Sequence, residues 1–134
     1  ESPIGPDGHS DADVLIHALM DALLGAAGLR DIGYYFPPED DAYKGISSLI
    51  LLKHVNSLLK EQGLEAYNID IMVISETPKL KPHIDTMKAN LQSVLDIPLD
   101  RISIKATTNE MLGAIGRREG IAAQAVVSVY EGEV

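Results

Sequence analysis

Cysteine and tryptophan are both absent from the 134 residues of the chain. Without cysteine there is no disulfide framework and no thiolate metal site, so any metal would be held by His, Asp and Glu. Aromatic residues make up only 4% of the sequence, whereas hydrophobic residues make up 46%. The core must therefore be aliphatic, and a small aliphatic domain often gains further burial by forming an oligomer.

Long apolar runs are also missing: none reaches the ~18 residues of a membrane-spanning helix, and no signal peptide is visible. Basic residues number 11 against 20 acidic residues, a formal net charge of −9 that disfavours non-specific binding to nucleic acids. The first 45 residues hold nine acidic and two basic residues, whereas seven basic residues follow from Lys79 onward. The acidic part would repel a phosphorylated ligand unless metal ions stood between them, and the basic part can hold the rest of it.

The pattern of apolar residues predicts helices over 11–28, 47–62 and 82–95, and strands over 67–74, 102–106 and 121–130. Loops are expected at Pro37, Pro78 and Pro82, because proline disfavours helix interiors and central strands. This order predicts an α+β fold with a single sheet and helices packed on one face. The length suits one domain, 1–134.

The segment from Gly8 to Asp21 offers the clearest local signal. We interpret it as a turn and a helix, with Ser10 as the N-cap and Asp13 completing a capping box. Asp13, His17 and Asp21 are spaced four apart and share one stripe of the helix. A histidine between two carboxylates can be held in the tautomer that a metal ligand needs, although a buried helix with a structural histidine explains the same residues.

A second group of polar residues, Lys105 to Glu110, follows the strand predicted over 102–106. The adjacent hydroxyls of Thr107 and Thr108, next to Lys105, can bind phosphate oxygens. Glu110 is either the far half of a capping box or a ligand for a hard cation such as Mg²⁺ or Mn²⁺. The spacing does not decide between these two readings.

The order G-H-S-D-A-D-V-x-x-H-A-L-x-D-A-L-L-G-A resembles the central motif of the 2-C-methyl-D-erythritol 2,4-cyclodiphosphate synthase family. The resemblance continues through Asp31-Ile32-Gly33, Phe36-Pro37, Pro78-Lys79 with Pro82-His83, and Lys105 to Glu110, and it spans nearly all of 8–130. It implies a zinc enzyme, a phosphorus-oxygen lyase, that converts 4-diphosphocytidyl-2-C-methyl-D-erythritol 2-phosphate to the 2,4-cyclodiphosphate and CMP in non-mevalonate isoprenoid biosynthesis. It also implies a homotrimer with sites between subunits, in a bacterial cytoplasm or a plastid stroma, acting on a small molecule rather than on nucleic acid or membrane.

The resemblance also assigns roles to individual residues. It implies that His17 is a zinc ligand, that Glu110 holds a second divalent cation, Mg²⁺ or Mn²⁺, and that Thr108 and His9 are catalytic. The substrate-binding residues that it implies are His9, Ser10, Asp31, Ile32, Gly33, Phe36, Pro37, Pro38, Glu39, Asp40, Ser75, Glu76, Thr77, Pro78, Lys79, Leu80, Lys81, Ala106, Thr107, Thr108, Asn109, Ala114 and Arg117.

Two features depart from the family pattern. In the family, a D-x-H motif near the N-terminus supplies two of the three zinc ligands. The only D-x-H spacing before His17 here is Asp7-Gly8-His9, and the resemblance already assigns His9 to substrate binding. We therefore expect an N-terminal strand and the D-x-H motif to lie before Glu1 in the natural chain. Pro38 stands where the family usually has an acidic residue.

Two alternative hypotheses are a catalytically impaired protein of this fold that binds cytidine nucleotides or isoprenoid diphosphates, and a trimeric scaffold.

Overall fold

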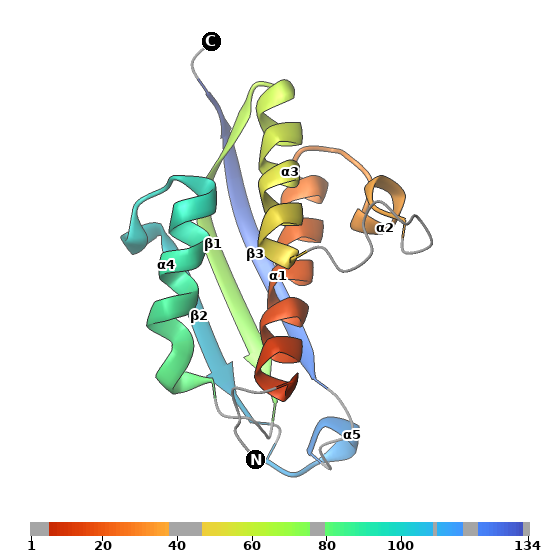
Figure 1. The fold of residues 1–134 in the computed structure, drawn as a ribbon, viewed down its shortest axis with the longest axis vertical. Coiled ribbons are helices and arrows are strands. Elements are labelled where there is room, and N and C mark those ends of the chain that lie inside the picture. The colour runs from red at the N-terminus through yellow and green to blue at the C-terminus, as the bar shows by residue number, and fades with distance from the viewer. Residues whose placement is uncertain (1–5, 38–46, 76–79, 109, 117–120, 133–134) are drawn as a thin grey trace.

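The computed structural model of the chain describes residues 6–37, 47–75, 80–108, 110–116 and 121–132, without the side chains of 6–11 and of Lys81 (Figure 1). The elements are α1 (Pro6–Ala26), α2 (Ile32–Tyr35), α3 (Ser48–Glu61), β1 (Leu64–Ile74), η2 (Lys81–His83), α4 (Ile84–Leu95), η3 (Leu99–Arg101), β2 (Ile102–Thr107), α5 (Gly113–Gly116) and β3 (Ala122–Glu131). All three predicted helices and all three predicted strands are therefore present, with the short α2 and α5 in segments where we expected only loops.

The three strands form one sheet in the order β2-β1-β3. The central strand β1 pairs in parallel with β2 and antiparallel with β3. Figure 1 shows α1, α3 and α4 on the same face of this sheet, with α4 over β2 and α1 over β3. The prediction of an α+β fold with one sheet and helices on one face is therefore confirmed.

The core lies between the helices and this covered face of the sheet, and it is entirely aliphatic. Leu15, Leu19 and Leu23 of α1 are fully buried there, and burying each leucine contributes roughly 1.5–3 kcal/mol. The alanines Ala123 and Ala125 of β3 pack against the same core. Their small side chains let α1 lie close to the edge strand.

The opposite face of the sheet has no helix over it among the described residues. Val126 is 71% exposed there. Tyr67 and Tyr130 meet edge to face with ring centroids 5.8 Å apart, and the Arg101 guanidinium lies 4.2 Å from the Tyr67 ring centre. We call the side chains that point away from the helices the uncovered face.

An irregularity in the pairing of β1 with β3 shapes this face. The register shifts between Ala66 and Asn68, so Tyr67 is an extra residue in β1. Tyr67 and Asn68 are consecutive exposed residues, whereas Ala66 before them and Ile69 after them are both buried. The bulge therefore lets both ends of β1 present apolar side chains to the same core.

The start of α1 corrects one prediction. The helix begins at Pro6, so Ser10 lies inside the helix and is not its N-cap. Proline is well placed at the first helical position, because its missing N–H would have no partner there and its φ is already helical. The predicted capping box between Ser10 and Asp13 is therefore wrong.

The end of α1 follows the expected glycine signal. Gly28 has a φ of +72°. The Gly28 N–H donates to the Gly25 carbonyl at 3.0 Å, and the Leu29 N–H donates to the Leu24 carbonyl at 2.8 Å. These two bonds form a Schellman motif, in which a left-handed residue after the helix satisfies its last carbonyls.

Gly28→Ala and Gly25→Ala should therefore change stability in opposite directions. Alanine at Gly28 must adopt a left-handed φ, so we expect a loss of about 1 kcal/mol in the free energy of unfolding. A Cβ at Gly25, inside α1, meets no atom within 4 Å, so alanine there should stabilise the chain by up to about 1 kcal/mol. Urea unfolding followed by circular dichroism measures both, and equal effects would contradict the assignment of Gly28 as the helix stop.

Candidate functional site

The predicted stripe on α1 is formed and faces away from the core. Asp13, His17 and Asp21 are all exposed, whereas Leu15 and Leu19 beside them are fully buried. The His17 imidazole makes no hydrogen bond or ion pair with any residue that the structure describes. His17 is therefore accessible as a ligand, and it has no structural partner among the described residues.

The two carboxylates of the stripe bind other partners than His17. Asp13 Oδ1 accepts a hydrogen bond from Ser48 Oγ at 2.5 Å, at the start of α3. Asp21 Oδ1 accepts one from the Ile32 N–H at 2.9 Å, at the start of α2. The stripe thus anchors two other elements on either side of His17, a function that the sequence spacing did not indicate.

The segment Asp31-Ile32-Gly33 opens the short helix α2. Asp31 is its N-cap, and Asp31 Oδ1 accepts from the Tyr34 N–H at 3.1 Å. The Gly33 N–H has no acceptor among the described residues. One carboxylate oxygen and one backbone donor therefore remain for a ligand hydroxyl at an exposed position.

Phe36 and Pro37 follow α2 and are half-buried. The Phe36 ring lies edge-on to the imidazole of His54, with centroids 6.2 Å apart. His54 is an exposed residue of α3, as expected from the sequence. This contact places the end of the segment 31–37 against α3.

The second predicted group of residues lies at the ends of β1 and β2. The Ser75 N–H donates to the Thr107 carbonyl at 3.0 Å, which joins the two strand ends. Thr107 and Thr108 are exposed, Ala106 is half-buried, and Leu80 is buried. The chain therefore presents the two threonines to solvent beside Ser75, where the predicted substrate-binding segment 75–81 begins.

The two threonine hydroxyls differ in their bonding. Thr107 Oγ1 donates to the Thr108 carbonyl at 3.4 Å. Thr108 Oγ1 accepts from the Glu110 N–H at 3.3 Å, which leaves its own proton free to donate among the described residues. The helical capping box considered for Glu110 is not formed, because residues 110 and 111 form a turn instead.

Lys105, which precedes Thr107 by two residues, pairs with a carboxylate of the neighbouring strand. Its Nζ lies 2.9 Å from Asp70 Oδ1 and donates to Asp70 Oδ2 at 3.2 Å. Both side chains belong to the uncovered face and are about half exposed. Lys105 therefore neutralises a carboxylate of the central strand.

The turn after Thr108 depends on a close backbone contact. Glu110 and Met111 both have left-handed φ values, 51° and 63°. A Cβ built on Gly116 would lie 2.1 Å from the Met111 carbonyl carbon, so only glycine fits there. Gly116 thus allows α5 to pack against this turn, and the exposed Ala114 lies within α5.

The start of α2 and the ends of β1 and β2 lie far apart within one chain. Figure 1 shows α2 beside the upper half of α1, whereas the ends of β1 and β2, where Ser75 and Thr107 lie, are at the opposite end of the sheet. No described cavity is lined by residues from both groups.

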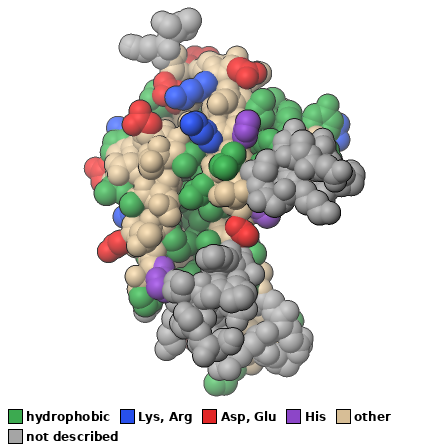
Figure 2. Space-filling model, in the orientation of Figure 1, with side chains coloured by type: hydrophobic (Ala, Val, Ile, Leu, Met, Phe, Trp, Pro, Cys, Tyr) green, Lys and Arg blue, Asp and Glu red, His purple; other side chains and the backbone are tan. Residues whose placement is uncertain are grey.

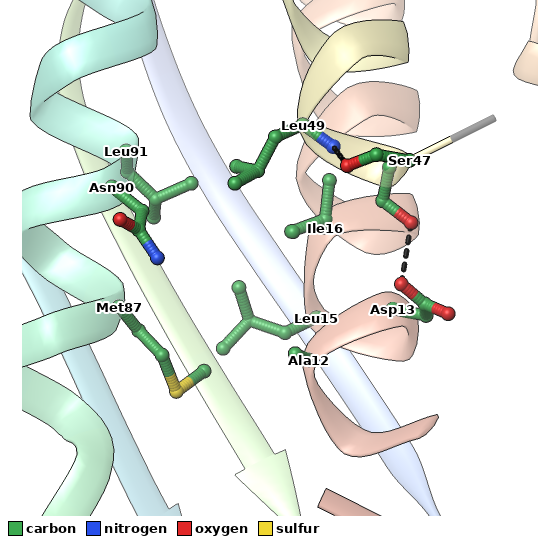
Figure 3. Close-up of a pocket in the computed structure, with 10 residues that line it drawn as sticks. Ala12, Asp13, Leu15, Ile16, Ser47, Leu49, Met87, Asn90 and Leu91 are labelled. Carbon is green, nitrogen blue, oxygen red and sulfur yellow. Dashed lines mark hydrogen bonds between the residues drawn. The ribbon is translucent and has the colours of Figure 1, made fainter. Parts of the chain in front are cut away.

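A cavity of about 600 Å³ lies between α1, α3 and α4 (Figure 3). Figure 2 shows hydrophobic side chains on the surface between α3 and α4, and the close-up adds the Asp13–Ser48 hydrogen bond at one side. None of the predicted site residues lines this cavity, whose walls are Ala12, Asp13, Leu15, Ile16, Ser47, Ser48, Leu49, Met87, Asn90 and Leu91.

Several predicted residues lie outside the described part. The backbones of His9, Ser10 and Lys81 are described but their side chains are not, and Pro38, Glu39, Asp40, Glu76, Thr77, Pro78, Lys79, Asn109 and Arg117 lie outside altogether. Within the described residues, no three His, Asp or Glu side chains form a group that could hold a metal ion. His17 and Glu110 therefore do not complete a metal site by themselves.

Among the described residues, no helix is long and apolar enough to cross a membrane.

Comparison with known proteins defines the class to which this fold and site belong. A model of the YgbB family matches residues 1–130. A protein of Synechocystis named 2-C-methyl-D-erythritol 2,4-cyclodiphosphate synthase is 60% identical over 123 residues, which is 92% of this chain and 76% of that protein. A protein of Synechococcus elongatus with the same name is 58% identical over 126 residues, 94% of this chain and 79% of its own length.

Solved structures agree in fold. The bifunctional IspDF of Campylobacter jejuni matches with a TM-score of 0.83 and 46% identity, over 87% of this chain and 31% of that one. A CDP complex of IspF from Plasmodium falciparum matches with a TM-score of 0.78 and 31% identity, over 90% of this chain and 72% of that one. The chain therefore belongs to the YgbB family, and the resemblance to the 2-C-methyl-D-erythritol 2,4-cyclodiphosphate synthases is confirmed.

Gly116→Ala should distort the turn that holds Thr108 and Glu110. Because its methyl group would overlap the Met111 backbone rather than a flexible side chain, we expect a loss of about 1–3 kcal/mol in stability. Amide exchange of residues 107–116, measured by mass spectrometry, should accelerate. Gly33→Ala is the control, because a Cβ there meets only Asp31 Oδ1 at 3.8 Å. Unchanged exchange in Gly116→Ala would contradict this packing.

Proposed function

We propose that the chain, as a single synthase domain over 1–134, converts 4-diphosphocytidyl-2-C-methyl-D-erythritol 2-phosphate to 2-C-methyl-D-erythritol 2,4-cyclodiphosphate and CMP. The observation that carries this proposal is the 58–60% identity, over more than nine-tenths of the chain, to proteins named for that product. The likeness to CDP-bound neighbours supports a cytidine nucleotide as a ligand. No observation favours the impaired binder or the scaffold over this reading.

The proposed reaction is an intramolecular phosphoryl transfer. An oxygen of the 2-phosphate attacks the phosphorus remote from cytidine, the bond from this phosphorus to the oxygen that it shares with the cytidine-bound phosphorus breaks, and CMP leaves with that oxygen. Nucleophile and electrophile belong to one molecule, so holding the substrate folded and neutralising its charge can supply most of the rate. The protein therefore needs donors to the phosphates and a grip on the erythritol hydroxyls.

Thr108 is the proposed donor to the reacting phosphate. Its Oγ1 is exposed and accepts from the Glu110 N–H, so its proton is available and its oxygen is already oriented. The Thr107 hydroxyl is committed to the Thr108 carbonyl. Charge that develops on phosphate oxygens in the transition state strengthens a hydrogen bond from a donor that is already in place.

The start of α2 is the proposed grip on the sugar alcohol. The Gly33 N–H and the second oxygen of Asp31 are free among the described residues, as donor and acceptor. One oxygen of the Asp31 carboxylate already accepts a hydrogen bond from the Tyr34 N–H, and this bond fixes the orientation of the carboxylate. A hydroxyl can donate to that carboxylate while it accepts from the amide.

Divalent cations are part of the proposal. The exposed His17, which has no partner in the described part of the chain, suits one position of a zinc site. The exposed Glu110 suits a hard cation, Mg²⁺ or Mn²⁺. A catalytic zinc site normally uses three protein ligands, and the described residues do not supply them. When bound, such cations neutralise phosphate charge.

A homotrimer is also proposed. It would bring the segment 31–33 of one subunit next to the Ser75–Thr108 group of another, because one chain holds these two segments far apart (Figure 1). The uncovered face, with Val126 71% exposed and Tyr67 and Tyr130 beside it, is the surface proposed to pair. His9, whose backbone lies in the first turns of α1, is proposed to belong to this shared site as well.

The full natural chain should release CMP from the diphosphocytidyl substrate, and chelation with EDTA or His17→Ala should abolish release. Absence of CMP from the metal-loaded wild-type protein would refute the function.

Thr108→Val should lower kcat about 10²–10³-fold, as expected for the loss of a donor to the transition state. Thr108→Ser, which keeps the hydroxyl, should restore most of the activity, and Thr107→Val should lose less because that hydroxyl is already committed. Equal losses in the two valine variants would contradict the assignment. Quenched-flow assays of CMP formation measure each kcat.

Val126→Lys should dissociate the proposed trimer, because it places an ammonium group in the interface while the cross-strand neighbour Asp70 is already paired with Lys105. Light scattering coupled to size-exclusion chromatography should show the mass fall towards that of one chain. Ile50→Lys is the matched control, since Ile50 is 51% exposed on α3, on the helical side. A mass that stays at three chains in Val126→Lys would remove the uncovered face from the interface.

A further inference from the structure

We propose that Asp21 is a positioning residue that fixes the segment Asp31-Ile32-Gly33 relative to His17. This inference rests on the proposed function, in which the segment 31–33 binds the sugar alcohol and His17 binds a cation. Asp21 would hold that segment in position relative to His17. The spacing in the sequence suggested only that Asp21 supports the His17 ring. The contacts assign it to the neighbouring segment instead.

The geometry links the two parts through one helical turn. Asp21 follows His17 by four residues on α1, a rise of about 6 Å along the helix axis. Asp21 Oδ1 accepts from the Ile32 N–H at 2.9 Å across a separation of eleven residues. The first amide of α2 is therefore held within one turn of His17 by a bond to the same stripe.

This bond completes the pairing at the start of α2. A helix leaves its first amides without intrahelical acceptors. Asp21 accepts from the Ile32 N–H, and Asp31 accepts from the Tyr34 N–H. The Gly33 N–H between them has no acceptor among the described residues. The carboxylates of Asp21 and Asp31 thus bind the N–H groups of Ile32 and Tyr34, and the N–H of the exposed Gly33 between them is left for a ligand.

Asp21 carries a negative charge as well as an acceptor, and the two roles are separable. Asp21→Ala removes both, whereas Asp21→Asn removes the charge and keeps an oxygen at the same place. Asp13 offers a matched control on the other side of His17. It is also four residues away, is also exposed, and bonds Ser48 of α3 rather than α2.

The test compares Asp21→Ala, Asp21→Asn and Asp13→Asn in the full chain loaded with zinc and Mg²⁺. Because hydroxyl contacts act in both the ground state and the transition state, Asp21→Ala should raise KM about tenfold and change kcat little. Asp21→Asn and Asp13→Asn should stay within about twofold of wild type. Amide exchange at residues 32–36 should accelerate only in Asp21→Ala.

A KM that rises equally in Asp21→Asn and Asp21→Ala would overturn the proposal, because the charge and not the bond would then matter. Unchanged KM and unchanged exchange in Asp21→Ala would overturn it as well. The exchange measurement needs no turnover. A wild-type protein that releases no CMP would therefore refute the proposed function, while exchange still decides whether Asp21 tethers α2.

Discussion

The packing of α1 against the sheet determines what the rest of the chain can present to a ligand. Its leucines are buried between β1, β3 and α3, so the stripe of Asp13, His17 and Asp21 has to face outward. The alanines of β3 permit this close approach. The position of a possible metal ligand is thus fixed by apolar contacts on the other side of the same helix, and interiors packed at crystal density tolerate little displacement.

The positions of the long helices and strands could be predicted from the sequence, because an element with one buried face repeats apolar residues at the period of a helix or a strand. The helix predicted over 47–62 is α3, whose N-cap Ser47 accepts from the Leu49 N–H, and Gly28 follows the end of α1. The start of α1 was not predictable from capping preferences alone, since Pro6 provides an earlier start than Ser10. The helices α2 and α5 are four residues each, too short to leave a periodic signal.

For the candidate site, spacing predicted which side chains share a surface but not their partners. Asp13, His17 and Asp21 do share one stripe, yet the carboxylates bond Ser48 and Ile32 rather than the imidazole. Lys105 lies beside the threonines in sequence, but a strand sends alternate residues to opposite faces, and it pairs with Asp70 of β1. Partners that lie tens of residues apart depend on strand register and helix packing, which a local pattern does not contain.

The bulge at Tyr67 has a consequence for how β1 can vary among relatives. In a regular strand, successive side chains alternate between the two faces of the sheet. At the bulge, two successive side chains face outward, and Ala66 and Ile69 on either side of them both face inward. Deleting Tyr67 or Asn68 would restore regular pairing and leave Ala66 and Ile69 facing inward, so β1 can lose one residue here without turning either of its ends over. Deleting Asp70 would instead turn Ile71 and Val73 away from the core. Selection should therefore tolerate a change of length at the bulge and remove one elsewhere in the strand.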